Sequence, residues 1–350
     1  MTYSIIEADP TRNREEILHV WENTYPGILG RKYEWIYENN PSGHAQVWLA
    51  RHEQSGHYIG VAALFSRSFI VNGLHCTAGI AADLLVDEAH RCAGVALMLQ
   101  RSVVSAAQQG KVDFIYGFPN NASDPIFRRV GYHRLGDKVR FVNVLKTEPY
   151  LSTLSGGRYW APLLGPVIDF SRKILSRKTL FSGANTFVCE QLTDFDQRFD
   201  RLFDLAASAF PIVGERRSTY LRWKFIQAPQ AANKIWAVLD VRREGVLGYI
   251  VHRPIGSSVE VRDFLAIPSP PAAHVLIASF LRHVRSSGAT SITLSLLSNP
   301  NIFLKFLDFG FVEREPTSPV YLYCSDRIAS MFPSVYKSEN WLLLQSDDDM

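Results

Sequence analysis

A loop of small residues ahead of a helix is the part of the sequence best suited to bind phosphate. Residues 90–96 read His-Arg-Cys-Ala-Gly-Val-Ala and follow an apolar run that ends at Val86. The first turn of a helix exposes N–H groups without partners and carries partial positive charge, so it attracts anions. Gly94 can adopt backbone angles closed to other residues, and Arg91 adds a permanent positive charge. The loop predicts a pyrophosphate site; the alternative is an ordinary turn from a strand into a helix.

The surroundings of this loop occur twice in the sequence, but the loop itself occurs once. Asp83 lies in an apolar run before the loop, and Asp263 lies in a matching run. The second run continues into residues 268–271, which read Pro-Ser-Pro-Pro. Proline has no backbone N–H to donate, so we expect only the first copy to bind the phosphate. Other matching positions are Trp35 with Trp223, Pro41 with Pro229, Trp48 with Trp236, Gly60 with Gly248, and Gly131 with Gly310.

The elements that position the loop alternate between strands and helices. In the first copy, Asn72-Gly73 between apolar runs predicts a tight hairpin. The resulting order, β-α-α-β-β-β-α-β-α-β-β, predicts the α/β class, more closely an α+β mixed sheet with helices on both faces. We expect strands at 3–7, 45–52, 58–65, 74–86, 114–117, near 132 and at 139–145, and helices from Asp9-Pro10 and at 33–38, 94–110 and 123–130.

The length of 350 residues predicts two domains. The duplication places them at residues 1–150 and 186–325. Between them, residues 151–185 form a linker, in which residues 166–178 carry apolar and basic side chains at helical spacing. We interpret this piece as a linker helix, although such a helix can also lie on a membrane surface. Residues 326–350 form a tail outside the repeat, with an acidic end at residues 347–349.

The composition is that of a soluble globular protein. A net charge of +3 argues neither for nor against nucleic acid, so no nucleic-acid partner is predicted. The four cysteines lie far apart without metal-ligand spacing, which predicts reduced thiols in the cytoplasm and no metal. No signal peptide and no apolar stretch of about 18 residues is visible, so no transmembrane segment is expected.

A wider pattern surrounds the loop. A strand precedes Arg91-x-x-Gly94-x-Ala96, and a helix, a strand and then Asn120-x(6)-Phe127-x-x-x-Gly131-Tyr132 follow it. This arrangement resembles the GNAT superfamily of acyl-CoA-dependent acyltransferases. The resemblance covers residues 1–145 with a good motif and residues 186–325 with a degenerate one, which implies two tandem GNAT-like domains with one coenzyme site. The overall layout is more loosely similar to GNAT proteins of bacterial exopolysaccharide biosynthesis.

The resemblance implies acetyl-CoA, or another acyl-CoA, as cosubstrate. Its pantetheine arm would pair with the backbone of Leu84, Leu85 and Val86, and its thioester would lie near Asn120 or Asn121. Phe127 departs from the pattern, because many members have a tyrosine there that gives a proton to the leaving thiolate. That role is vacant in this chain or filled elsewhere. The pyrophosphate would meet the backbone N–H groups of Arg91, Cys92, Ala93, Gly94, Val95 and Ala96.

Acyl transfer to an amine requires a base for the ammonium and a polarised thioester carbonyl. Asp83 is the candidate base, because burial beside the thioester would raise its pKa. The alternative is that Asp83 pins a strand bulge, and the presence of Asp263 in the second copy favours it. Tyr116 is the candidate acid, with a half-buried sheet tyrosine as the alternative.

These residues predict an N-acetyltransferase that acts on a small-molecule or glycan amine, such as an amino sugar of a polysaccharide precursor. We expect the second copy to build part of the acceptor cleft. Most of its aromatic residues are expected to be core. Trp341 in the tail is a freer candidate for substrate contact, but a packing anchor is the favoured interpretation. Two alternatives remain: a Fem-like transferase that uses aminoacyl-tRNA, and a non-catalytic binding protein with a GNAT shell.

Overall fold

The computed structural model describes residues 2–22, 29–91, 94–146, 186–229, 232–297 and 306–348. The predicted linker helix and two loop residues, Cys92 and Ala93, lie outside these ranges. The first half comprises β1 (Tyr3–Ala8), α1 (Arg14–Glu22), α2 (Leu29–Tyr33), the π-helix η1 (Glu34–Glu38), β2 (Gln46–His52), β3 (Tyr58–Val71), β4 (Leu74–Val86), η2 (Glu88–His90), α3 (Val95–Gln108), β5 (Phe114–Gly117), α4 (Asp124–Arg129) and β6 (His133–Val144).

The second half follows the same order of main strands and helices, with an additional strand β8, and ends in a tail. It comprises β7 (Phe187–Leu192), α7 (Gln197–Ala206), η4 (Ala207–Ala209), β8 (Ile212–Gly214), α8 (Ser218–Phe225), β9 (Lys234–Asp240), β10 (Val246–Ile255), β11 (Ser258–Ala266), α9 (Pro270–Ser286), β12 (Ser291–Leu297) and β13 (Val312–Cys324). The tail contains α11 (Asp326–Met331), η5 (Pro333–Tyr336), η6 (Ser338–Asn340), β14 (Trp341–Leu342) and η7 (Gln345–Asp347).

The sequence misplaced two elements of the first half. The first helix begins at Arg14, because the Asp9 carboxylate accepts hydrogen bonds from the N–H groups of Thr11 and Arg12 and caps a preceding turn instead. The two strands expected near 132 and at 139–145 are one strand, β6. The predicted hairpin at Asn72-Gly73 is confirmed, since β3 and β4 pair up to the register Val71 with Leu74.

Strand register confirms the internal repeat. In the first half Gln46 pairs with Leu64, and in the second half Lys234 pairs with His252. Both partners are displaced by 188 residues, the separation that also relates Trp35 to Trp223. The two copies therefore share one arrangement of their central strands.

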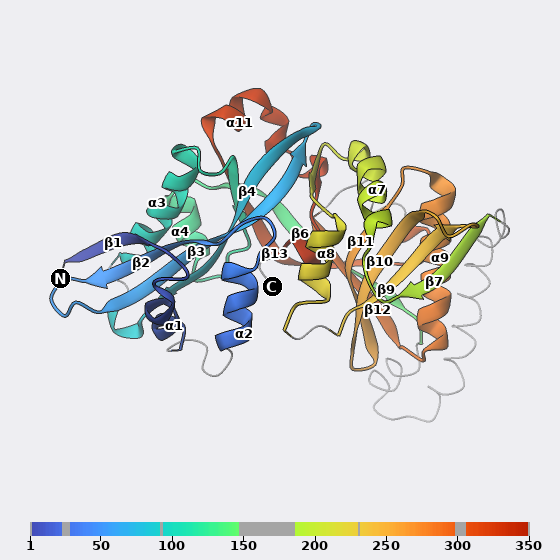
Figure 1. Ribbon diagram of the computed structural model, residues 1–350, viewed down its shortest axis with the longest axis horizontal. Coiled ribbons are helices and arrows are strands. Elements are labelled where there is room, and N and C mark those ends of the chain that lie inside the picture. Colours follow the sequence, from blue (N-terminus) through green and yellow to red (C-terminus); the bar gives the residue numbers. More distant parts are fainter. Residues whose placement is uncertain are drawn as a thin grey trace.

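The last strand of each copy lies in the sheet beside the other copy. In the described residues one continuous sheet holds 14 strands, in the order β1-β2-β3-β4-β5-β13-β6-β12-β11-β10-β9-β7, with β8 and β14 off this path (Figure 1). β13 pairs with β5 and β6, and β6 pairs with β12. Neither copy completes its own sheet, so the two copies are joined through their final strands.

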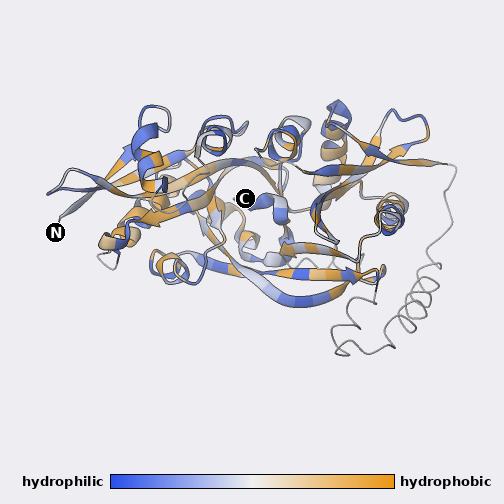
Figure 2. Cartoon of the chain, turned by 90° about the horizontal axis from the view of Figure 1, so that it is seen from below, coloured by the Kyte–Doolittle hydropathy of each residue, from blue (hydrophilic) through white to orange (hydrophobic). Residues whose placement is uncertain are grey.

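Helices cover both faces of this sheet. Leu99 of α3 and Phe127 of α4 share one hydrophobic cluster, while Trp21 of α1 and Tyr37 of η1 belong to the other. The hydrophobic stretches of the strands lie next to helices on either side (Figure 2). The mixed sheet with two helical layers agrees with the fold class expected from the sequence.

A pair of tryptophans joins the two halves at matching positions. The Trp35 indole N–H donates to the Trp223 carbonyl at 2.8 Å, and the Trp223 indole N–H donates to the Trp35 carbonyl at 2.9 Å. Their rings stack with centroids 4.8 Å apart. Because each indole makes the same contact with the other, the pair marks the pseudo-twofold axis between the copies.

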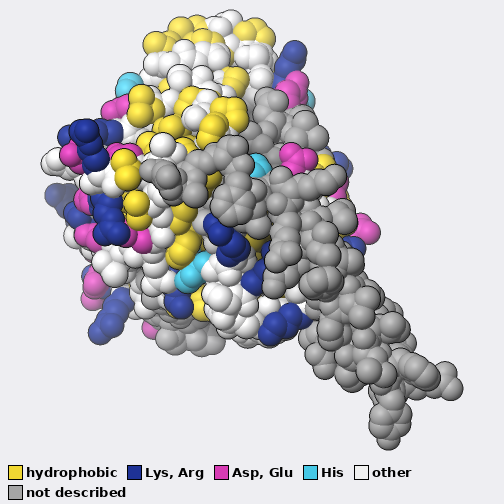
Figure 3. Space-filling view, turned by 90° about the vertical axis from the view of Figure 1, so that its right-hand side faces the viewer, with side chains coloured by type: hydrophobic (Ala, Val, Ile, Leu, Met, Phe, Trp, Pro, Cys, Tyr) yellow, Lys and Arg dark blue, Asp and Glu magenta, His cyan; other side chains and the backbone are white. Residues whose placement is uncertain are grey.

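The exposed charges of the second half are mixed in sign. At the end of the molecule shown in Figure 3, Lys and Arg side chains lie among Asp and Glu along one edge, beside a band of hydrophobic side chains. In the described part of the chain, no helix is both long and apolar enough to cross a membrane. Nor do His, Cys, Asp and Glu side chains of those residues gather in threes that could hold a metal ion.

The second half buries a histidine where the first half has leucine. His252 is 3% exposed and matches Leu64 in register. Neither of its ring nitrogens has a hydrogen-bond partner among the described residues. Burial, together with the nearby His283 and Lys234, lowers the pKa of His252 to about 4. The imidazole is therefore neutral in the folded protein at physiological pH.

We expect His252→Leu to remove an acid-dependent loss of stability. The unfolded chain binds a proton at this histidine near pH 6.5 and the folded chain only near 4, so wild-type stability falls as the pH decreases between these values. The full difference is on the order of 3 kcal/mol. Urea unfolding at pH 7.5 and pH 4.5 measures it. The exposed His57→Leu is the control and should follow the wild type; a His252→Leu variant with the wild-type pH dependence would contradict the prediction.

Candidate functional site

The end of β4 extends beyond its ladder with β5. β4 pairs with β3 as far as Val86 and with the parallel strand β5 only as far as Ala81, which lies opposite Gly117. Residues 82–86, the β4 extension, therefore run past β5 and lead directly to the loop before α3. This extension contains the backbone of Leu84, Leu85 and Val86, for which the sequence predicts contact with pantetheine.

Gly94 begins helix α3 in a conformation that favours glycine. Its φ is +83°, and a Cβ placed there would meet nothing within 4 Å, so the space beside its backbone is open. The Arg91 side chain folds back, and its Nε donates to the Val86 carbonyl at 3.2 Å. Val95 is buried under the helix and Ala96 is half-buried. The backbone requirement inferred for Gly94 is confirmed; phosphate binding by the loop stays a prediction.

Asp83 lies at a bulge in β4. The register between β3 and β4 shifts here, so that Ala63 pairs with Ala82 but Val61 pairs with Leu85. Asp83 has a φ of +49°, which is rare outside glycine, although Asp and Asn tolerate it best. Such strained residues cluster at functional sites. The bulge foreseen as the structural role of Asp83 is present, and it also fixes where the carboxylate points.

The hydroxyl of Tyr37 holds the Asp83 carboxylate. It donates to Asp83 Oδ2 at 2.7 Å from the π-helix η1. Burial and the Asp83 charge raise the pKa of Tyr37 well above its ordinary value, so the hydroxyl keeps its proton. Short π-helices occur frequently at functional sites. Tyr37 was not predicted from the sequence, because nothing in its spacing distinguishes it from the neighbouring core aromatics.

Tyr116 is fully buried, and its hydroxyl donates to the Asp347 carbonyl at 3.0 Å. Burial first, and then the Asp347 charge, raises its pKa well above the ordinary value. The ring of Phe127 packs against the end of β5, where a Cβ on Gly117 would lie 3.0 Å from it. The structure thus brings Phe127 to the end of the β4–β5 ladder but ties Tyr116 to the C-terminal tail.

The two asparagines lie at the start of α4. Asn120 is exposed, and its Oδ1 accepts hydrogen bonds from the N–H groups of Ala122 and Ser123 at 3.0 Å each. Asn121 is also exposed. Asn120 therefore shapes the turn that follows β5, while contact of either residue with a thioester stays a prediction.

The second copy lacks the glycine start of its helix. Ser269 precedes α9, and Pro270 and Pro271 occupy the first turn, where they offer no N–H groups. The inference that these prolines lie where the helix begins is confirmed.

In the second copy, strands β11 and β12 correspond to β4 and β5 of the first. The C-terminal tail lies beside β12 where its ladder with β11 has ended, which corresponds to the space beside the β4 extension. The β11–β12 ladder ends at Val261 with Leu294, although β12 continues to Leu297. Beyond that point the Leu297 N–H donates to the Leu343 carbonyl at 3.0 Å, and Leu296 forms a bridge with Leu344. Because β6 pairs with the other edge of β12, the tail lies on its β11 side. In the second copy the tail therefore fills the space beside β12, and prolines occupy the first turn of α9.

The tail carries a buried carboxylate into the space between the halves. Asp347 is 0% exposed and forms ion pairs with Arg67 of β3 at 3.2 Å and Arg216 at 2.5 Å. Arg216 also pairs with Asp263 at 3.0 Å, and Asp263 accepts a hydrogen bond from Ser346. Burial alone would raise the pKa of Asp347, but Arg216 and Arg67 outweigh it and hold the pKa below its ordinary value.

Two residues of the acidic end of this tail, Asp347 and Asp348, are buried. The apolar run at residues 341–344 was the available signal for burial, since all four side chains are at most 1% exposed. Trp341 is one of them and donates to the Val335 carbonyl at 2.7 Å. It is a packing residue, as the favoured interpretation of the sequence had it, and the alternative of substrate contact is ruled out by its burial.

Comparison with solved structures identifies the architecture. A probable N-acyltransferase from Enterococcus faecalis V583 has a TM-score of 0.67 at 12% identity, over 93% of this chain and 73% of that one. A GCN5-related N-acetyltransferase from Anabaena variabilis has a TM-score of 0.65 at 13% identity, over 93% and 74%. N-myristoyltransferase from Saccharomyces cerevisiae, with bound myristoyl-CoA, has a TM-score of 0.54 at 10% identity, over 92% and 82%.

No protein-family model matches the sequence, and no curated protein matches it. The structural similarity nevertheless extends over both copies, because each alignment covers more than nine-tenths of the chain. At such low identity it concerns the fold. The chain has the same fold as solved GCN5-related N-acetyltransferases.

Proposed function

We propose that the protein is an acyl-CoA-dependent N-acyltransferase that transfers an acetyl group from acetyl-CoA to an amine, with an amino sugar of a polysaccharide precursor as the acceptor class. The observation that carries the proposal is the path from the β4 extension to α3, which offers backbone groups and then the open left-handed Gly94. A helix start of this kind accommodates a phosphate. Residues 82–86 and the loop would hold the cosubstrate.

The reaction requires the amine to lose a proton, and Asp83 is the group proposed to accept it. The amine nitrogen then forms a bond to the thioester carbonyl carbon and the carbon–sulfur bond breaks. The acylated nitrogen loses its second proton, which balances the proton that the thiolate takes up. Asp83 lies on the β4 extension and is oriented by Tyr37. The backbone of the extension positions the acyl group. Tyr116 is the proposed proton donor to the thiolate, a role that requires its hydroxyl to leave the Asp347 carbonyl to which it donates.

Isothermal titration with acetyl-CoA tests the proposal. We expect the wild type to bind acetyl-CoA. Gly94→Pro should bind it at least about tenfold more weakly, since proline cannot adopt the positive φ at this position. Absence of binding by the wild type, or equal binding by the variant, would contradict the proposed function.

A matched pair of alanine variants distinguishes an effect of the loop on acetyl-CoA binding from an effect of the whole helix. Gly94→Ala and Gly110→Ala stand at opposite ends of α3, both with positive φ and with nothing within 4 Å of the added Cβ. The backbone strain is therefore similar. Only Gly94→Ala should weaken acetyl-CoA binding, and equal weakening by both variants would assign the effect to the helix as a whole.

A non-catalytic coenzyme A-binding protein is the second candidate. Two observations favour it: Phe127 has no hydroxyl, and the Tyr116 hydroxyl is bonded to the tail. Tight binding of acetyl-CoA without release of thiol in the presence of a panel of amines would support this candidate over the transferase.

A further inference from the structure

The carboxylate proposed as the base is held by a side chain from an element other than its own strand. Asp83 lies at the bulge in β4, and the Tyr37 hydroxyl reaches its Oδ2 from η1, at 2.7 Å. Asp83 is half-buried while Tyr37 is 0% exposed, so the hydrogen bond joins the protein interior to a group that solvent reaches. The bulge fixes the backbone of Asp83, and this contact fixes the direction of its side chain.

Three aromatic rings fix the ring of Tyr37. It stacks on Tyr33 with centroids 4.4 Å apart and an interplanar angle of 10°. It meets Trp21 and Phe65 edge to face, with centroids at 5.5 and 5.2 Å. All four side chains are at most 3% exposed. A ring packed on this many sides cannot move its hydroxyl without disturbing the core, so the hydrogen bond to the carboxylate keeps one geometry.

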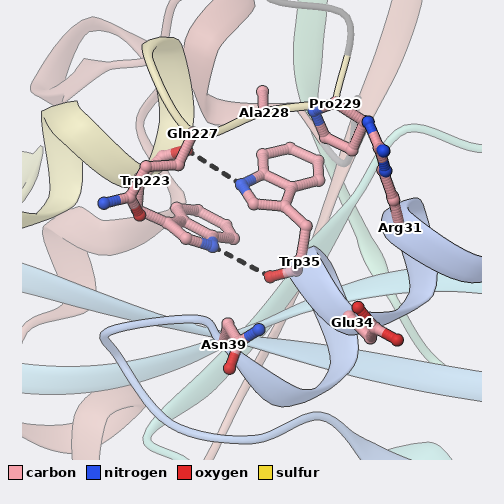
Figure 4. A pocket seen from close by; sticks show the side chains of 8 residues that line it. All are labelled: Arg31, Glu34, Trp35, Asn39, Trp223, Gln227, Ala228 and Pro229. Atoms are coloured by element: carbon pink, nitrogen blue, oxygen red, sulfur yellow. Dashed lines mark hydrogen bonds between the residues drawn. The ribbon is translucent and has the colours of Figure 1, made fainter.

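The second copy also holds η1. Trp35 stacks on Trp223, and each indole N–H donates to the backbone carbonyl of the other tryptophan (Figure 4). The Trp35 carbonyl belongs to the backbone of η1, so the second copy bonds directly to the helix that carries Tyr37. η1 is therefore fixed both by the core of the first copy and by the interface between the copies.

The matching aspartate of the second copy has a different kind of partner. Asp263 is 0% exposed and pairs with the Arg216 guanidinium at 3.0 Å, in addition to a hydrogen bond from the Tyr249 hydroxyl. A permanent positive charge at this distance opposes protonation of a carboxylate, which makes the carboxylate a poor base. A neutral hydroxyl stabilises the ionised form by a hydrogen bond alone, so an aspartate held as Asp83 is can still accept a proton.

We infer that Tyr37 is a positioning residue for Asp83: its hydroxyl fixes the direction of the carboxylate and favours the ionised form that a base needs. This inference rests on the proposed function for the role of Asp83 as the base. The control of the carboxylate by Tyr37 can be measured without turnover. A tyrosine with only a packing role would stabilise the fold and leave the ionisation of Asp83 as it is.

Carbon-13 NMR of the aspartate side-chain carboxyl groups in the full-length protein tests the inference, with the Asp83 signal assigned by its loss in Asp83→Asn. In Tyr37→Phe the titration midpoint of this signal should lie about one pH unit above that of the wild type, because the ionised carboxylate has lost a hydrogen bond. The matched control is Tyr33→Phe, which removes a buried hydroxyl from the stacked neighbouring ring. That hydroxyl donates to the Pro10 carbonyl, so the midpoint should stay unchanged.

Kinetics distinguish positioning from packing. With acetyl-CoA and glucosamine as the amine probe, kcat of Tyr37→Phe should be roughly tenfold lower than that of the wild type, with an unchanged KM for acetyl-CoA. In the Asp83→Asn background the same substitution should change kcat less than about twofold, because it acts only through the carboxylate.

An unchanged midpoint in Tyr37→Phe, an equal shift in Tyr33→Phe, or an undiminished effect of Tyr37→Phe in the Asp83→Asn background would each overturn the inference. Titration of acetyl-CoA into the same samples keeps the two proposals apart. Acetyl-CoA binding without the midpoint shift rejects the role of Tyr37 alone. The midpoint shift without acetyl-CoA binding rejects the proposed function and leaves the control of the Asp83 carboxylate by Tyr37 standing.

Discussion

Asp347→Ala should lower the free energy of unfolding by about 3–5 kcal/mol, the typical result of removing one partner from a buried ion pair. Arg67 and Arg216 are each about 1% exposed. The variant leaves Arg216 paired with Asp263 alone and leaves Arg67 without an ion-pair partner among the described residues. It also removes the acceptor for the Leu344 N–H. Urea unfolding at neutral pH measures the loss.

The matched control for this variant is an exposed ion pair. Asp194 pairs with Arg222 at 2.6 Å, and both side chains are about half exposed, so Asp194→Ala should cost less than about 1 kcal/mol. Because the folded-state pKa of Asp347 is lowered, its contribution is present at neutral pH and is lost as the pH falls below the ordinary range of an aspartate. Equal costs for the two variants would show that the tail does not depend on its buried charge.

Asp83→Asn should lower kcat about 100- to 10,000-fold, the usual contribution of a general base. Asparagine matches aspartate in shape, tolerates the φ of +49° and can still accept the hydrogen bond from Tyr37. The bulge should therefore persist while the base is lost. Steady-state kinetics with the amine acceptor measures kcat, and acetyl-CoA titration should give an unchanged Kd.

The same variant decides between the two roles of Asp83. If the carboxylate only pins the bulge, Asp83→Asn retains nearly full activity and Asp83→Ala loses stability. If it is the base, both variants lose activity. The second copy shows that an aspartate at this position can be structural, since Asp263 is fully buried and paired with Arg216.

Local features of the site could be predicted because they depend on short-range backbone chemistry. Gly94 begins α3 with positive φ, and Pro270 and Pro271 occupy the first turn of α9, as their residue types require. The hairpin at Asn72-Gly73 follows from the same kind of preference. The repeat could also be found, since its spacing of 188 residues appears in sequence and in strand register alike.

Contacts between distant segments could not be predicted in this way. Strands β6 and β13 each present an edge that can pair with several neighbours, and only the packing of both copies selects β13 for β5 and β6 for β12. The acidic residues at 347 and 348 are typical of a solvated tail. They are buried because Arg67, Arg216 and Lys138 are brought to them from elements far apart in the chain.

The sequence by itself determined the duplication, the mixed sheet, and the single glycine loop that distinguishes the first copy from the second. These features rest on residue type and spacing, which act over a few neighbours. The tertiary structure decided the exchange of the last strands, the tail beside β12, the Tyr37 hydrogen bond to Asp83, and the stacked pair of Trp35 and Trp223. Each of these needs two segments far apart in the chain to meet, and their meeting is set by how the two hydrophobic cores pack together.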